Sequence, residues 1–398
     1  MRKAIKWIGA VLMLVVAGCG GGQDQASSDL PRGVTDDSIV IGSHTDLSGG
    51  LAIWGVPLTN GQRMRYEEVN ASGGIHGRKI KLIVEDSQYQ MPIAVKATNK
   101  LLNVDNIFLM VGSMGTPMNI ALMPRMFEVN VPSLFPLTAG VQMYEPLHPM
   151  KFSYFVSYRD QIRGGMAYMV DKYGIKSVCM QAVANDYGHE NELGFAQATE
   201  ELGLEIAYEG RHKGAETDFI GTITAIKNSG CEMLVLGPLV KDTILIYSAA
   251  RDAGWDAPII SNMVSYVPEV ATAANGAMEG LYAAASFYIP DFEAEAVAGT
   301  WAGQWSEKYI AEFGETPAPQ SVIGYVIGDL VVRALEGAGP DITLDKVLAA
   351  LEGIEKYEDQ FGGPTLSFSP TKHQGGDFLN FYQVIDGKWQ VVESNLSF

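Results

Sequence analysis

Cysteine, basic residues and long apolar runs are all scarce in this chain of 398 residues. Three cysteines are too few for the disulfide framework of a small secreted scaffold. Lysine and arginine number 28 against 46 acidic residues, a formal charge of −18, so the phosphates of a nucleic acid would be repelled. The longest apolar run, WIGAVLMLVVAG, is shorter than the ~20 residues of a membrane-spanning helix. The 47% of hydrophobic residues indicates a globular protein with a large core.

Familiar catalytic motifs are also missing. The sequence contains no G-x-S-x-G, H-E-x-x-H, C-x-x-C or GxxxxGK[ST] pattern. None of its six histidines pairs with another at the spacing of metal ligands. We therefore expect a binding protein, with no enzyme activity, no metal and no cofactor.

The first residues have the pattern of a targeting segment. Arg2, Lys3 and Lys6 precede the apolar run, which ends at Val16-Ala17-Gly18-Cys19. This pattern resembles a bacterial lipoprotein signal, in which the cysteine receives a lipid. We predict a signal peptide at 1–19, lipidation of Cys19, a flexible tether at 20–36 and a lipid-anchored protein in the periplasm or cell envelope. The alternative is an ordinary secretory peptide with an incidental cysteine.

From Ser38 onward, short β-rich runs alternate with helical patterns, which predicts an α/β fold with parallel sheets. The alternation stops near VPSLFP and starts again at SVCMQAV, so we expect two lobes of similar architecture. Three extended stretches, HPMKFSYFVSYRDQ, GLYAAASFYIP and TLSFSPTKHQGG, are predicted to cross between the lobes. Lobe 1 is then formed by 37–155 with 286–366, and lobe 2 by 156–285 with 367–398.

The loop in FLMVGSMGTPMN has the composition of an anion-binding site at the start of a helix. Gly112 and Gly115 permit close approach of the backbone, and Thr116 is predicted to cap a helix that has Pro117 at its first position. Amide groups and a hydroxyl would then face an anion. Without the lysine of a nucleotide-binding loop, a carboxylate is the expected anion. A purely structural cap is the alternative.

Several segments, taken in order, resemble one protein family. They are IVIGSHTDLSGGLAIWG, EEVNASGGIHGRKIKLIVEDSQ, VGSMGTPMN, ANDYGHE and VIDGKWQVV. Together they are similar to the periplasmic solute-binding proteins of ABC importers, in the leucine/isoleucine/valine-binding branch, from about Ser38 to Val392. The resemblance implies a type I periplasmic binding fold, with two Rossmann-like lobes and three hinge crossings. It also implies a small-molecule ligand, a membrane permease as partner and a monomer.

The ligand site is expected where strand ends meet in the cleft. Trp54 is predicted to form a wall or lid, or else to pack inside a lobe. Thr138 and Ala139 are interchangeable candidates for the ligand's carboxylate, and Tyr187 matches a tyrosine that the family places against the ligand. The full set of predicted binding residues is Trp54, Ser113, Met114, Gly115, Thr116, Leu137, Thr138, Ala139, Tyr187, Pro238, Asn262 and Met263.

One feature departs from the family's amino-acid binders, which usually bring an acid from the second lobe to the ligand's ammonium group. The segment IISNMVSYVP contains no acid, and a buried ammonium without a partner costs several kcal/mol, on the order of ~2–7. We therefore expect a carboxylate ligand without an α-amino group, with an aromatic or aliphatic body. A branched-chain or other amino acid is the alternative ligand, and a sensor feeding a membrane receptor is the alternative function. Whether Cys179 and Cys231 form a disulfide is left open.

Overall fold

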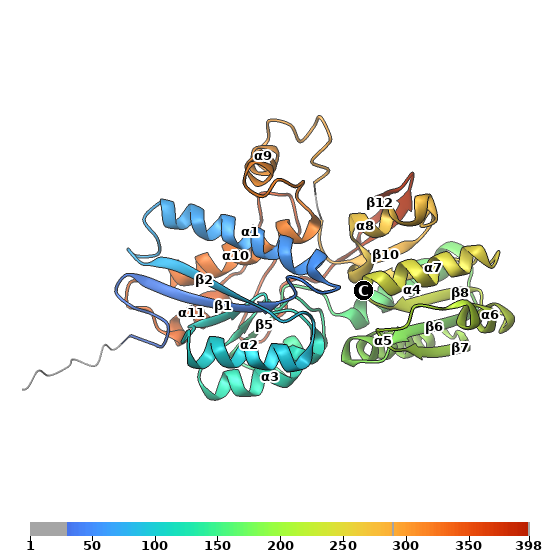
Figure 1. The fold of residues 1–398 in the computed structure, drawn as a ribbon, viewed down its shortest axis with the longest axis horizontal. Helices are drawn as coiled ribbons and strands as arrows, with labels where there is room; N and C mark the ends of the chain where they lie inside the picture. The colour runs from blue at the N-terminus through green and yellow to red at the C-terminus, as the bar shows by residue number, and fades with distance from the viewer. Residues whose placement is uncertain (1–29, 289, 397–398) are drawn as a thin grey trace, which may run out of the picture.

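The computed structural model describes residues 30–288 and 290–396, and it divides into two α/β halves, each built on its own sheet (Figure 1). The first sheet has the order β2-β1-β3-β4-β5 and is parallel throughout. Its strands are β1 (Ser38–Thr45), β2 (Lys79–Asp86), β3 (Leu109–Val111), β4 (Ser133–Leu134) and β5 (Lys151–Phe152).

The second sheet has the order β12-β11-β10-β9-β8-β6-β7. Its strands are parallel from β7 to β10, and β11 and β12 form an antiparallel hairpin at the edge. Asp386 and Gly387 form the hairpin turn, both with positive φ, as expected for this dipeptide. The strands are β6 (Ser177–Val183), β7 (Glu205–His212), β8 (Met233–Gly237), β9 (Ile259–Asn262), β10 (Tyr282–Ala285), β11 (Leu379–Ile385) and β12 (Lys388–Leu396).

Helices cover both sheets, so the predicted α/β class is confirmed. In the first half, helices from the start of the chain pack with helices from near its end (Figure 1). They are α1 (Ala52–Ala71), α2 (Met91–Asn103), α3 (Thr116–Glu128), η1 (Val141–Met143), α9 (Trp301–Phe313), α10 (Pro319–Gly337) and α11 (Leu344–Glu352). The second half contains α4 (Tyr158–Tyr173), α5 (Asp186–Leu202), α6 (Ile220–Asn228), α7 (Val240–Asp252), η2 (Met263–Ser265), α8 (Pro268–Ala271) and η3 (Ala273–Gly276).

The chain passes between the halves after β5, after β10 and before β11. Hydrogen bonds join these crossings to one another. The amide of Ser153 donates to the carbonyl of His373 at 2.9 Å, and the amide of Val156 donates to the Ser286 hydroxyl at 3.1 Å. The crossings therefore lie together as one hinge region, and the residue boundaries of the two lobes remain a proposal.

Helix α1 begins at Ala52, so Trp54 lies in its first turn. Two glycines in this helix make close contacts that a side chain would prevent. A Cβ on Gly55 would come within 2.0 Å of the Asp46 carbonyl oxygen, and one on Gly61 within 1.9 Å of the Ser321 carbonyl oxygen. These glycines therefore let α1 pack tightly and do not interrupt it.

The predicted signal peptide, Cys19 and most of the predicted tether lie outside the described residues. The last part of that tether is packed, because the Arg32 guanidinium donates to the carbonyls of Ile107 at 2.9 Å and Val129 at 3.1 Å. Over the part of the chain that the structure describes, no helix is long and apolar enough to cross a bilayer. Cys179 and Cys231 are joined by a disulfide, which answers the question the sequence left open.

Candidate functional site

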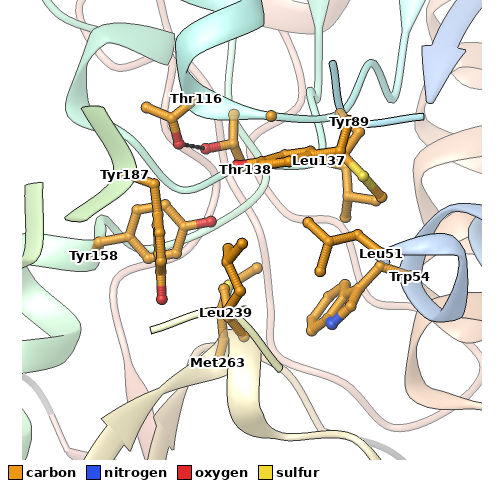
Figure 2. A pocket seen from close by; sticks show the side chains of 13 residues that line it. Leu51, Trp54, Tyr89, Thr116, Leu137, Thr138, Tyr158, Tyr187, Leu239 and Met263 are labelled. Atoms are coloured by element: carbon orange, nitrogen blue, oxygen red, sulfur yellow. Dashed lines mark hydrogen bonds between the residues drawn. The ribbon is translucent and has the colours of Figure 1, made fainter. Parts of the chain in front are cut away.

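A pocket that is partly open to solvent lies between the two halves (Figure 2). Its walls come from the carboxyl ends of strands and the helix starts that follow them, the place where open α/β sheets bind ligands. The first half contributes Leu51, Trp54, Tyr89, Met114, Gly115, Thr116, Leu137 and Thr138. The second half contributes Tyr158, Tyr187, Leu239, Met263 and Val264.

Hydroxyl groups gather at one end of the pocket, at the start of α3. The Oγ1 atoms of Thr116 and Thr138 are 2.6 Å apart and share a hydrogen bond (Figure 2). The helix starts one residue earlier than predicted: Gly115, with φ 100°, is the N-cap and Thr116 is the first helical residue. Gly115 is required there, because φ lies in the left-handed region and a Cβ would approach Met118 Sδ to 2.8 Å. The Thr116 N–H has no hydrogen-bond partner among the described residues.

Tyr158 adds a third hydroxyl to this end. Its amide donates to the Ala139 carbonyl at 2.9 Å, which fixes the start of α4 beside the two threonines. Burial raises the pKa of the Tyr158 phenol to about 12, although hydrogen bonds with Thr138 and the Ala139 backbone oppose that rise. Tyr158 is therefore protonated at neutral pH and available as a hydrogen-bond donor.

Tyr187 forms a wall of the pocket with its ring. The ring stands edge-to-face against Tyr158, with centroids 4.8 Å apart. Its hydroxyl donates to the Pro238 carbonyl at 3.0 Å and accepts from Asn262 Nδ2 at 2.9 Å. The amide of Val264 donates to Asn262 Oδ1 at 2.8 Å. The Tyr187 hydroxyl is therefore held by the protein, and only the ring is offered to a ligand.

Eight of the twelve predicted binding residues line the pocket and four do not. Pro238 and Asn262 lie behind Tyr187, where they hold its hydroxyl. Ser113 is turned inward, with its hydroxyl donating to Asn119 Oδ1 at 2.6 Å. Ala139 was interchangeable with Thr138 in the prediction, but its carbonyl is used by Tyr158 and only Thr138 lines the pocket.

The sequence reasoning did not single out Leu51, Tyr89, Tyr158 or Val264 as ligand contacts, although all four line the pocket. Tyr89 follows β2 and Tyr158 follows the crossing from β5, so both come shortly after a strand end. A position shortly after a strand end is therefore the sequence feature from which both tyrosines could have been predicted as ligand contacts. Tyr89 has φ 50°, which is uncommon for a tyrosine and turns the chain sharply before α2.

No charged side chain occurs among the described residues that line the pocket. The nearby acid Asp46 is buried and accepts amide hydrogens from its own loop, at 3.2 Å from Ser48 and 2.8 Å from Leu51. Met263 lies in IISNMVSYVP, the segment in which an acid would be expected for an amino-acid ligand, and it lines the pocket as an apolar group. The chemistry of the walls therefore suits an apolar body with an anionic end.

Trp54 lies at the opposite side of the pocket from Tyr158 and Tyr187 (Figure 2). The indole is 4% exposed, and its Nε1 has no hydrogen-bond partner in the described part of the chain. The sequence left two alternatives for Trp54, a wall of the pocket and packing inside a lobe, and the structure shows features of both. The side chain is buried in a large apolar cluster and also lines the pocket.

Comparison with known proteins was consistent with this geometry. The sequence profile of the family described as periplasmic binding protein matches residues 38–388. An amino acid binding protein of Pseudomonas aeruginosa is 29% identical over 273 residues, covering 67% of this chain and 69% of the relative. A Leu/Ile/Val-binding protein homolog 2 of Brucella abortus is 27% identical over 255 residues, covering 62% and 67%.

Solved structures show the same fold. A fatty acid ABC transporter substrate-binding protein from Thermomonospora curvata superposes with a TM-score of 0.80 at 24% identity, covering 92% of this chain and 94% of that one. A branched-chain amino acid ABC transporter protein from Thermus thermophilus with bound valine gives 0.81 at 17% identity, covering 92% and 98%. This chain therefore belongs to the periplasmic binding protein family, as an extracytoplasmic binding protein with the type I fold that is similar to leucine/isoleucine/valine-binding proteins.

Proposed function

We propose that this protein captures a small carboxylate without an α-amino group and delivers it to the permease of an ABC importer. The observation that carries the proposal is a pocket with hydroxyls and a helix start at one end and no charged side chain in its described lining. The carboxylate would accept hydrogen bonds from Thr116, Thr138 and Tyr158.

The electrostatics of the pocket favour an anion over a zwitterion. The start of α3 supplies the partial positive charge of a helix N-terminus, and hydroxyls and a free amide supply donors. An ammonium group in the same pocket would find no carboxylate, and burying it unpaired costs several kcal/mol, about 2–7. The cost of burying an unpaired ammonium group therefore argues against amino acids as ligands.

The remaining walls support an apolar ligand body. Trp54, Leu239 and Met263 offer aromatic and aliphatic surface, which is the usual lining of a small-molecule site. An acid with an aliphatic or single-ring aromatic body suits this surface. The named substrate of the Thermomonospora curvata protein, a fatty acid, is likewise a carboxylate without an amino group.

A branched-chain amino acid is the alternative ligand, and the names of several relatives favour it. Calorimetric titrations with phenylacetate, hexanoate and leucine distinguish the two ligand classes. We expect at least one of the two acids to bind more tightly than leucine. Phenylacetamide, which has the shape of phenylacetate without its charge, is the matched control and should bind weakly. Micromolar leucine binding with no binding of either acid would overturn the proposal.

Native mass spectrometry of freshly purified protein provides an independent route to the ligand, because a retained small molecule reports its own mass. A retained mass that corresponds to a carboxylic acid supports the proposal, and one that corresponds to leucine, isoleucine or valine contradicts it.

We also propose that the mature protein is a monomer anchored through a lipid on Cys19, which the pattern Val16-Ala17-Gly18-Cys19 supports. In cells grown with labelled palmitate, the parent should take up the label and a Cys19→Ala variant should not. An unlabelled parent, or equal labelling of parent and variant, would refute a lipid anchor on Cys19.

A further inference from the structure

A buried carboxylate joins the two halves of the molecule outside the pocket. Glu190 lies on α5, one turn beyond Tyr187, and its side chain is only 1% exposed. Arg159, on α4 in the same half, donates to it through two nitrogens, with Nε–Oε2 3.0 Å and Nη2–Oε1 2.8 Å. This bidentate pair fixes the orientation of the carboxylate.

The same carboxylate receives two further hydrogen bonds from the other half. The amide of Val141 donates to Oε2 at 3.2 Å, and the side-chain amide of Gln142 donates to Oε1 at 2.7 Å. Both donors belong to η1, which follows β4 of the first sheet. We refer to Glu190, Arg159, Val141 and Gln142 as the Glu190 cluster.

The cluster is placed where it can influence the pocket without touching a ligand. Val141 follows Thr138 by three residues, so its η1 turn is attached to the polar end of the site. Arg159 follows Tyr158 directly, and Glu190 follows Tyr187 by three residues. None of the four cluster residues is among the pocket's lining residues. The hydrogen bonds of the Glu190 cluster therefore link the segments that form the pocket walls, although the cluster itself does not line the pocket.

Separation of the two halves would remove both η1 donors from a carboxylate that keeps its two hydrogen bonds from Arg159. The Arg159–Glu190 pair would stay intact, because both residues belong to the second half. The two bonds from η1 are charge-assisted, and bonds of this kind are stronger than neutral ones. They form only when the halves are together, so they favour the closed arrangement.

We propose that Glu190 is a positioning residue that holds the two halves closed over the pocket, so that part of the energy of closure comes from the protein and less must come from the ligand. The consequence for ligand affinity rests on the proposed function, whereas the effect on closure does not depend on the identity of the ligand.

The experiment removes the two donors from the first half and leaves Arg159 and Glu190 in place. Gln142→Ala deletes the side-chain donor. Val141→Pro deletes the amide donor at the first residue of η1, where proline is tolerated. Gln197→Ala is the matched control, because Gln197 Nε2 donates to Glu201 Oε1 at 3.0 Å within α5 and not across the halves.

Small-angle X-ray scattering of the ligand-free proteins measures closure directly, and thermal unfolding checks that each variant is folded. We expect the radius of gyration to rise in Gln142→Ala, to rise further in the double variant with Val141→Pro, and to stay at the parent value in Gln197→Ala. We expect phenylacetate to bind the double variant about tenfold more weakly than the parent. Radii that coincide in the parent and the folded double variant would overturn the inference. A larger radius in the variant, with neither phenylacetate nor hexanoate binding to any of the proteins, would support the Glu190 cluster and contradict the proposed ligand class.

Discussion

The hydroxyl of Thr116 is the residue-scale feature on which carboxylate binding depends most. It lies at the first residue of α3, 2.6 Å from the Thr138 hydroxyl, at the polar end of the pocket. Thr116→Val keeps the shape of the side chain and removes the hydroxyl. We expect at least about tenfold weaker phenylacetate binding, because a hydrogen bond to a charged group contributes about 1.5–3 kcal/mol.

Calorimetry of Thr116→Val beside Thr116→Ser checks this expectation. Serine keeps the hydroxyl and should stay within about fivefold of the parent affinity, since a single methyl group contributes on the order of 1 kcal/mol or less. Equal affinities in the valine variant and the parent would remove Thr116 from the ligand site.

His44 is a second residue with a measurable consequence, this time for stability. It is fully buried on β1, and neither ring nitrogen has a hydrogen-bond partner in the described structure. Burial lowers its pKa to about 4, against about 6.5 in an unfolded chain. Between these values the unfolded chain takes up a proton that the folded protein does not, so the free energy of unfolding falls as pH falls from about 6.5 toward 4. The full effect is about 3 kcal/mol.

Urea unfolding at pH values from 7 to 4 measures this contribution as a slope. We expect the pH dependence to be shallower in His44→Leu than in the parent, whatever the absolute stability of the variant. His189→Ala is the control, because His189 is exposed and pairs with Glu192 at 3.3 Å. If His44→Leu loses stability with pH as steeply as the parent does, His44 is not the group responsible.

At the scale of elements, the disulfide ties two neighbouring strands of the second sheet. Cys179 lies in β6 and Cys231 just before β8, with 52 residues of separation along the chain. A cross-link over a loop of that length stabilises the fold by up to about 4 kcal/mol through the reduced freedom of the unfolded chain. We expect dithiothreitol to lower the thermal midpoint of the parent and to leave that of the Cys179→Ala/Cys231→Ala double variant unchanged. Free thiols in the folded parent, detected by mass after alkylation, would contradict the bridge.

Elements with a continuous strand or helix pattern were predictable from the sequence. Elements whose formation depends on tight packing against a distant part of the chain were not. The β2 run KIKLIVED has the bounds Lys79–Asp86 in the structure, because β-branched and apolar residues dominate it and Arg78 and Ser87 flank it with polar residues. Helix α1 contains glycine and Pro57, which weaken its helical pattern. Tertiary packing of that helix against α10 overrides the weak local preference, and the sequence alone does not display that packing.

The candidate site was predictable to the level of loops. Strand ends located the segments around Thr116, Thr138 and Tyr187 correctly, because parallel sheets place these ends along one edge. The direction of a side chain within a loop depends on its hydrogen bonds, which is why Asn262 proved to support Tyr187 and not to line the pocket. Tyr158 was missed for a related reason: it acquires its place only when the crossing brings α4 beside Ala139.

At the scale of the whole molecule, the pocket is completed by both halves (Figure 2). Thr116 and Thr138 come from the first half, and Leu239 and Met263 from the second. A ligand that touches both halves binds the closed arrangement more tightly than the open one, so it shifts the population toward closure. A permease that recognises the closed shape would then respond to ligand occupancy.

Closure and stabilisation by ligand should therefore appear together. With free phenylacetate at 100 times its dissociation constant, linkage adds about 2.7 kcal/mol to the free energy of unfolding. We expect the thermal midpoint to rise and the radius of gyration to fall in the same samples, measured by calorimetry and small-angle scattering. Phenylacetamide should change neither quantity, because it lacks the charge that the start of α3 attracts. A higher midpoint with an unchanged radius would show that the acid stabilises the fold without shifting the population toward the closed arrangement, and it would contradict this prediction.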